Sequence, residues 1–176
     1  MTLQLASCPT SFALLSVVLS VLWFAVTWSS SASAERKTEN FNRDWKFKRG
    51  AMEGGERVEL DDGAWSDVRL PHDWAIAGPF DPEDNPHTAK LPWRGEGWYR
   101  KRFTLGADAE KKRIYLDFDG AMAMPRVYVN GHAAGGWDYG YMGFRVDATP
   151  YVEIGKPNLV AVHLDTSFHS SRWYPG

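Results

Sequence analysis

The stretch RVYVNGHAAG, residues 126–135, indicates the fold class of this chain. Val127 and Val129 recur with the two-residue period of a strand that buries one face. The pair Asn130-Gly131 follows at once, and two-residue hairpin turns favour it because both central residues need a positive φ. The stretch therefore predicts a strand, a tight turn and an antiparallel return strand.

The same alternation recurs along the rest of the chain. Trp45 and Phe47 alternate with lysines, and Ile114, Leu116 and Phe118 alternate with polar residues. Further strands are expected around residues 66–70, 97–105, 141–152 and 158–165. No segment shows a sustained helical period, so about seven or eight antiparallel strands are expected. This pattern predicts an all-β fold, a β-sandwich, with the jelly roll as the favoured form.

Length and composition set broad limits on function. The chain has 176 residues, of which 44% are hydrophobic and 14% aromatic, and nine of them are tryptophan. This content is enough for one domain with a sizeable core, and the aromatic excess suits a β-rich core or a sugar-stacking surface. The formal net charge of −2 shows no basic excess. Neither nucleic acid nor an anionic membrane surface is therefore an expected partner.

The N-terminus has the pattern of an export signal. No charged residue occurs between Thr2 and Ala34, residues 12–28 are almost continuously apolar, and Ala32 and Ala34 have the spacing of a cleavage site. We expect residues 1–34 to be a signal peptide and the mature domain, residues 35–176, to be periplasmic or extracellular, with no membrane contact. An uncleaved membrane anchor is the alternative, because the segment lacks the usual basic start and is long for a signal.

The sequence contains no motif that predicts a cofactor or a metal. It has no phosphate-binding loop, no Cys/His metal spacing and no nucleophile elbow, and Cys8 in the leader is its only cysteine. We therefore expect no cofactor and no metal. The histidines are expected to be structural or exposed. They are His72, His87, His132, His163 and His169.

Glycosidic hydrolysis needs two carboxyl groups about 5–10 Å apart, and the sequence offers no convincing pair. Asp117 and Asp119 share one strand face, which is expected to be solvated. The pairs at residues 61–62 and 83–84 lie in loops with no evident scaffold. We therefore predict no catalytic residue in this chain.

The stretch LPHDW, residues 70–74, allows two interpretations. His72 and Asp73 could form a catalytic dyad. Alternatively, Trp74 packs into a buried corner while the polar pair satisfies nearby backbone groups. The second interpretation is favoured, because buried polar groups usually have this structural role.

Several longer motifs, in order, resemble a known family. They are LPHDWAIAGPFDPEDNP, LPWRGEGWYRKRFTL, RVYVNGHAAGGWDYGYMGFRVDATPYV, NLVAVHLD and SRWYPG. Together, from about Phe41 to Gly176, they resemble the N-terminal sugar-binding domain of family 2 glycoside hydrolases, most closely that of bacterial β-galactosidases. The resemblance implies a galactose-binding-domain-like jelly roll.

The resemblance also implies further domains. In relatives, this domain precedes an immunoglobulin-like sandwich and a TIM barrel with two catalytic glutamates. SRWYPG resembles the front of a longer motif, so we expect a fragment whose catalytic glutamates would lie beyond Gly176. A truncated gene model or a broken reading frame would both produce it.

By the same resemblance, loops of this domain help to close a pocket for a terminal β-linked sugar. The matching positions are Ser170, before the Arg-Trp-Tyr run, and Asn85, in the proline-rich loop. Arg172 and Trp173 either shape the pocket or pack at the domain junction. The implied partners are a carbohydrate and the C-terminal domains of the same enzyme.

A free-standing carbohydrate-binding module is the alternative function. Such a module should show two or three coplanar exposed rings on one face. An enzyme domain should bury most of its aromatic side chains, or expose them at one edge.

The leader gives a first prediction. Expression in a bacterial host with a Sec pathway should yield a protein whose N-terminal residue is Glu35, because the small residues before it match a signal-peptidase site. N-terminal sequencing of the exported protein measures this. An intact Met1 or Thr2 terminus in the membrane fraction would instead show a tethered domain.

Overall fold

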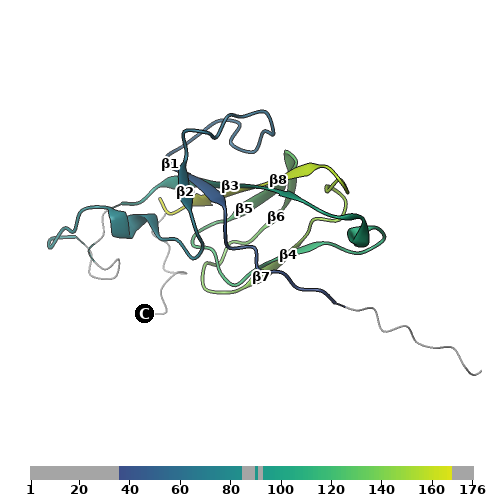
Figure 1. Cartoon of the computed structure of the whole chain (residues 1–176). Helices are drawn as coiled ribbons and strands as arrows, with labels where there is room; N and C mark the ends of the chain where they lie inside the picture. Colours follow the sequence, from purple (N-terminus) through teal and green to yellow (C-terminus); the bar gives the residue numbers. More distant parts are fainter. Residues whose placement is uncertain (1–35, 85–89, 91–92, 168–176) are drawn as a thin grey trace, which may run out of the picture. The chain divides into compact units, whose positions relative to one another are not determined.

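The computed structural model of the chain describes residues 36–84, 90 and 93–167 (Figure 1). The chain divides into two units, Met1–Glu39 and Asn40–Gly176. All strands of the described part belong to the second unit, to which the following paragraphs refer. The predicted leader lies outside the described residues.

Six strands form one antiparallel sheet in the order β2-β1-β3-β8-β5-β6, and two more form a small antiparallel sheet, β4-β7. The strands of the large sheet are β2 (Ser66–Val68), β1 (Trp45–Arg49), β3 (Glu96–Thr104), β8 (Pro157–Asp165), β5 (Arg126–Val129) and β6 (His132–Gly136). The small sheet consists of β4 (Tyr115–Phe118) and β7 (Phe144–Asp147). These eight strands of the described part agree with the sequence prediction.

The hairpin predicted at residues 126–135 is confirmed. Asn130 and Gly131 have φ of 50° and 81°, and they join β5 to β6. The Asn130 side chain also donates from Nδ2 to the carbonyl oxygen of Tyr151 at 2.8 Å and accepts from the backbone N–H of Leu159 at 2.8 Å. The residue that permits the turn thus also fixes it against β8.

The main core lies on one face of the large sheet, where β4 and β7 lie across it (Figure 1). Its buried side chains come from alternate positions of the strands, as period-two burial requires. They include Trp45, Phe47, Tyr99, Val127, Val129, Val146, Val160, Val162 and Leu164. The arrangement is an all-β sandwich, which confirms the predicted fold class at that level.

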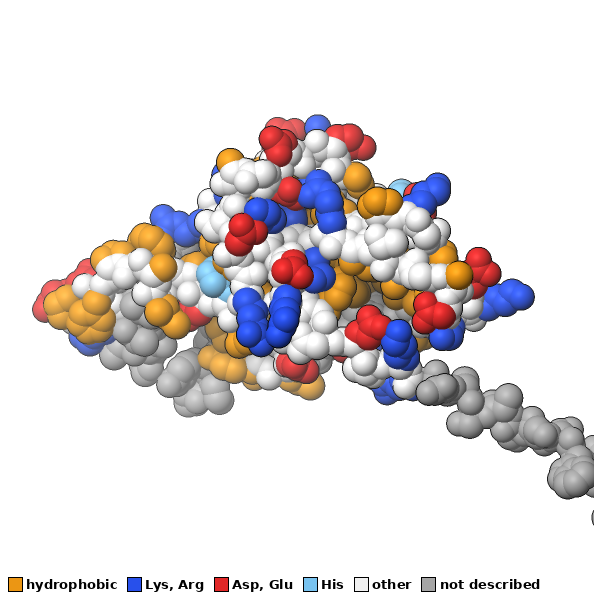
Figure 2. Space-filling view, in the orientation of Figure 1, with side chains coloured by type: hydrophobic (Ala, Val, Ile, Leu, Met, Phe, Trp, Pro, Cys, Tyr) orange, Lys and Arg blue, Asp and Glu red, His pale blue; other side chains and the backbone are white. Residues whose placement is uncertain are grey.

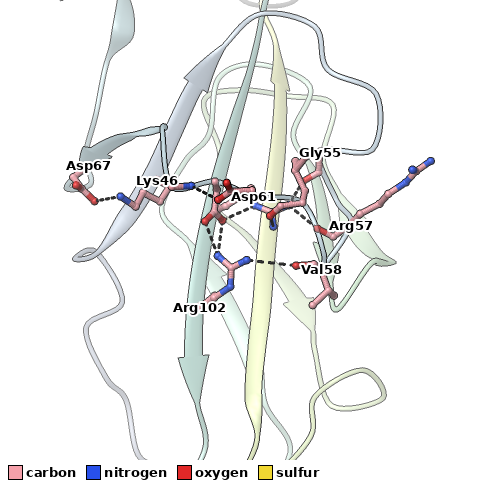
Figure 3. Close-up of polar contacts among 11 residues, drawn as sticks. Lys46, Gly55, Arg57, Val58, Asp61, Asp67 and Arg102 are labelled. Carbon is pink, nitrogen blue, oxygen red and sulfur yellow. Dashed lines mark hydrogen bonds and ion pairs between the residues drawn. The ribbon is translucent and has the colours of Figure 1, made fainter.

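The other face of the large sheet is covered by the segment 51–65, which crosses β3 (Figure 3). Arg100 of β3 is fully buried there. It donates from Nε to the Asp62 carboxylate at 2.8 Å, and from Nη1 to the carbonyl oxygens of Gly55 and Arg57 at 2.6 and 2.8 Å. A fourth bond, from Nη2 to Leu60, is 3.2 Å long.

Asp62 is a correction to the sequence analysis, which found no scaffold for it. Its carboxylate accepts from both Arg100 and Arg102, the latter at 2.6 and 2.7 Å. Burial opposes ionisation of Asp62, but hydrogen bonds from Arg100 and Arg102, with their charges, outweigh it and lower its pKa. The group is therefore a structural anion.

Small residues allow close packing at two crossings. A Cβ on Gly55 would lie 2.4 Å from the Trp98 ring, and one on Gly97 would lie 2.0 Å from the Trp74 ring. Each glycine therefore lets an indole lie flat against backbone, one on each face of β3.

The Arg100 cluster gives a second prediction. Arg100→Ala should lower the free energy of unfolding by about 3–5 kcal/mol, because it leaves the Asp62 charge buried with one partner fewer. Chemical denaturation monitored by tryptophan fluorescence measures the change. Arg100→Lys keeps the positive charge but has fewer donors in a different geometry, so it should lower the free energy of unfolding by a smaller amount.

The matched control is Arg145→Ala. Arg145 pairs with Asp117 on an exposed strand face, with both side chains 47% exposed. Its removal should shift the transition far less. Equal losses at Arg100 and Arg145 would contradict the structural role of the buried cluster.

Candidate functional site

The four residues that the family resemblance singles out, Asn85, Ser170, Arg172 and Trp173, lie outside the described residues. Their roles therefore stay predictions. Asn85 belongs to the proline-rich loop, and the other three belong to the C-terminal segment. The described residues next to these two segments show where each joins the sheet.

Both segments join the large sheet at the same end. The proline-rich loop leads into Gly95 and β3, while the C-terminal segment leaves the end of β8. Glu96 pairs with Asp165 across these strands, and the next residue, Thr166, donates its backbone N–H to the Gly95 carbonyl at 2.8 Å. The Thr166 hydroxyl accepts from the Gly95 N–H at 3.0 Å. Gly95 and Thr166, the described residues where the two segments join the sheet, thus contact each other directly.

The described part of the proline-rich loop is itself held by charge and packing. Arg94 donates to both carboxylate oxygens of Asp84, at 3.0 and 2.9 Å. The Arg49 guanidinium lies 3.9 Å from the centre of the Trp93 ring, and a Cβ on Gly78 would lie 2.6 Å from the same indole. Charge pairing and close packing therefore hold both ends of this loop at the sheet end.

The LPHDW stretch forms the buried corner that the sequence analysis favoured. Trp74 begins the short 3-10 helix η1 (Trp74–Ala77), and its side chain is buried. Asp73 caps this helix by accepting from the backbone N–H of Ala75 at 2.9 Å. His72 Nδ1 lies 2.8 Å from the Tyr99 hydroxyl. The two polar side chains therefore serve different partners, and no dyad forms between them.

Burial changes the titration of this corner. Desolvation lowers the pKa of His72, against a smaller opposing effect from the Asp73 charge. Desolvation likewise raises the pKa of Tyr99 well above its usual range, with a contribution from Asp73. At neutral pH the corner is thus a neutral imidazole bonded to a neutral phenol.

The carboxylates form no acid–base pair in the described part of the chain. Asp117 accepts from Arg145 on an exposed face, as the solvated interpretation predicts. Asp62 is held by two arginines. Among the described residues there is also no group of three or more His, Cys, Asp or Glu placed to hold a metal ion. None of the described helices has the length and apolarity that crossing a membrane requires.

Most of the described tryptophans are interior. Trp45, Trp65, Trp74 and Trp98 are buried, whereas Trp137 is 43% exposed. Near Trp137, the rings of Tyr139 and Tyr141 are inclined to one another by 55°. The two phenol rings are therefore not coplanar, and the burial of most described tryptophans is what the enzyme-domain interpretation expects.

Exposed apolar side chains also occur beside η1. Ile76 is 72% exposed and Phe80 is 65% exposed. Figure 2 shows hydrophobic side chains gathered at the left tip of the molecule, over the segment that follows η1 in Figure 1. An exposed patch of apolar side chains of this kind commonly marks an interaction site.

The sequence analysis missed a second group at this sheet end. Trp137, Tyr139 and Tyr141 alternate with small or polar residues in GGWDYGYMG, residues 135–143, beside Arg126. Three aromatics at alternate positions were a readable signal, since aromatic side chains in a glycine-rich loop cannot all be buried by that loop.

The fold defines the class at the level of an all-β sandwich domain with exposed aromatic and apolar side chains at one sheet end. Residues 39–176 match the family described as "Glycosyl hydrolases family 2, sugar binding domain". The chain therefore belongs to glycoside hydrolase family 2, as its sugar-binding domain, which confirms the resemblance seen in the sequence.

Curated relatives and solved structures agree with this assignment. A beta-galactosidase of Bacteroides ovatus is 38% identical over 151 residues, which cover 84% of this chain and 18% of that protein. A putative beta-glucuronidase of Formosa agariphila is 35% identical over 143 residues, which cover 80% and 14%. A beta-glycosidase structure from Bacteroides vulgatus superposes with a TM-score of 0.70 at 35% identity, covering 79% and 18%. The chain thus spans less than a fifth of the length of these relatives.

The buried corner gives a third prediction. Because the folded state lowers the pKa of His72, the unfolded chain binds a proton at this residue more readily than the folded chain does. This contribution to stability is complete above the ordinary pKa of 6.5 and is lost as the pH falls below it. His72→Gln should therefore flatten the dependence of the melting temperature on pH between about 7.5 and 5.5.

His132→Gln is the matched control, because His132 is exposed. This variant should keep the pH dependence of the unsubstituted chain. An unchanged slope in His72→Gln would contradict the assignment.

Proposed function

We propose that this chain is the N-terminal, non-catalytic sugar-binding domain of an exported, β-galactosidase-like family 2 glycosidase. The observation that carries the proposal is the family match over residues 39–176. The contacts between Gly95 and Thr166, from which the two proposed sugar-contacting segments extend, support it. The sandwich would be a jelly roll, and residues 1–34 a signal peptide.

In this proposal, Asn85 and Ser170 supply polar contacts to a terminal β-linked sugar. Arg172 and Trp173 shape the pocket or pack against a following domain. The two carboxylates of a retaining glycosidase, about 5–5.5 Å apart, belong to another domain of the same enzyme. Hydrolysis would proceed through a covalent glycosyl intermediate on one of them.

The lack of a carboxylate pair in the described residues supports a division of labour between domains. This domain restricts and orients the sugar, and the remaining domains perform the chemistry. Binding contacts of this kind act on the affinity for substrate more than on the chemical step.

A chimera tests the proposal. Residues 39–176 would replace the matching domain of the Bacteroides ovatus beta-galactosidase, to which this chain is 38% identical. We expect the chimera to hydrolyse a chromogenic β-galactoside. Asn85→Ala and Ser170→Ala in the chimera should each raise KM about fivefold to tenfold, since each removes one polar contact to the sugar.

Ser66→Ala, on the exposed edge strand β2, is the matched control and should leave KM unchanged. The unfused chain should show no turnover. Hydrolysis by the unfused chain that survives repurification, and that a single Asp or Glu substitution abolishes, would overturn the proposal. A folded but inactive chimera would do the same.

A further inference from the structure

An open pocket lies where β5 begins and β6 ends. It is lined by Arg126, Gly136, Trp137, Asp138 and Tyr139, and its volume is about 420 Å³. Pockets that bind small ligands have volumes of about 300–1,000 Å³, so this one is large enough for a sugar ring.

Two aromatic side chains line this pocket, Trp137 and Tyr139, which are 43% and 36% exposed. Tyr141, the aromatic neighbour of Tyr139, is 52% exposed. The ring centres of Tyr139 and Tyr141 are 5.9 Å apart. Pyranose rings present C–H groups on one face, and these pack against the electron-rich face of an aromatic ring. An exposed indole beside two phenols therefore suits a saccharide.

The polar side of the pocket is an ion pair. Arg126 donates from Nη2 to Asp138 Oδ1 at 2.8 Å, and the two side chains are 43% and 71% exposed. A guanidinium and a carboxylate each have capacity for several hydrogen bonds, so both can also contact sugar hydroxyls. Their charges cancel, which favours a neutral ligand over an anionic one.

Backbone contacts hold the pocket in shape. The Trp137 N–H donates to the Pro125 carbonyl at 3.1 Å, and Arg126 Nη1 donates to the same oxygen at 3.0 Å. A Cβ on Gly136 would lie 2.4 Å from that oxygen, so only glycine permits this approach. The aromatic and charged side chains therefore start from a fixed frame, which reduces the entropic cost of binding.

The pocket lies at the sheet end where Gly95 and Thr166 contact each other, the described residues from which the two proposed sugar-contacting segments extend. Arg126 of β5 pairs with His163 of β8, and Glu96 of β3 pairs with Asp165. The Asp165 N–H also donates to the Ala123 carbonyl at 2.9 Å. Since neighbouring strands are about 4.8 Å apart, β5 lies roughly 10 Å from β3. This separation is comparable with the length of two linked sugar rings.

We propose that this pocket binds a neutral sugar unit of a β-linked oligosaccharide, beyond the terminal unit. Trp137 stacks on the pyranose ring, and the Arg126–Asp138 pair contacts its hydroxyls. The proposal rests on the proposed function for the terminal sugar, but this pocket binds a different sugar unit of the same oligosaccharide. It therefore favours oligosaccharides over monosaccharides.

The test is calorimetric titration of the purified full chain with β-1,4-galactotetraose. The tetraose should bind, and Trp137→Ala should weaken binding about fivefold or more, as expected for the loss of one stacked ring. Trp137→Phe, which keeps a ring, should retain most of the affinity. Thermal melting of each variant confirms that it is folded.

Two further variants sharpen the test. Tyr115→Ala is the matched control, because Tyr115 is 40% exposed on another strand, and it should bind as the unsubstituted chain does. Asp138→Asn removes the charge that neutralises Arg126, so it should increase binding of the same tetraose oxidised at C6 to its uronate form. This reversal of charge preference is not expected of a loss of structure.

Absence of tetraose binding by the unsubstituted chain would overturn the proposal. Equal binding by Trp137→Ala, or failure of Asp138→Asn to favour the uronate form, would overturn it as well. None of these results depends on hydrolysis by the chimera, so failure here and failure of the proposed function can be told apart.

Discussion

A single buried guanidinium determines how the large sheet is covered on its outer face. Arg100 lies in β3 at the centre of that sheet, and its bonds to Asp62 and to three carbonyl oxygens hold the segment 51–65 across the strands. Trp65, the last residue of this segment, and Trp98 of β3 are both buried between the segment and the sheet. Without the guanidinium, the hydrogen bonds that hold the segment over the two indoles would be lost, and β3 would be packed on one face only.

The same strand carries the constraint to the sheet end that we propose contacts sugar. β3 is packed on both faces, with Trp74 against Gly97 on one and Gly55 against Trp98 on the other. Its first residues therefore have a fixed position. Beside them, Gly95 accepts from the Thr166 backbone N–H and donates its own N–H to the Thr166 hydroxyl. A rigid central strand thus fixes the points where the proline-rich loop and the C-terminal segment join the sheet, and functional loops usually extend from such rigid scaffolds.

The polar groups of the domain differ in role, as the corner at His72 and the Arg126–Asp138 pair show. The buried His72–Tyr99 contact stabilises the corner from which the proline-rich loop departs. The Arg126–Asp138 pair is exposed and adds little to stability, which leaves it available to a ligand. Polar residues with similar appearance in the sequence therefore differ because burial differs.

Period-two patterning and turn chemistry act locally. The strands, the hairpin at Asn130-Gly131 and the β-sandwich class were therefore predictable from the sequence. The ordered motifs also identified the family. The buried corner at Trp74 was also predictable. The pairing of Arg100 with Asp62 was not, because the two residues lie 38 positions apart and neither has a local pattern that names its partner. The β5–β6 pairing was predictable, but only the tertiary structure shows that Arg126 and Trp137 line one open pocket beside the end of β8. Side-chain periodicity decides which face of a strand is buried, whereas only the tertiary structure decides what covers that face.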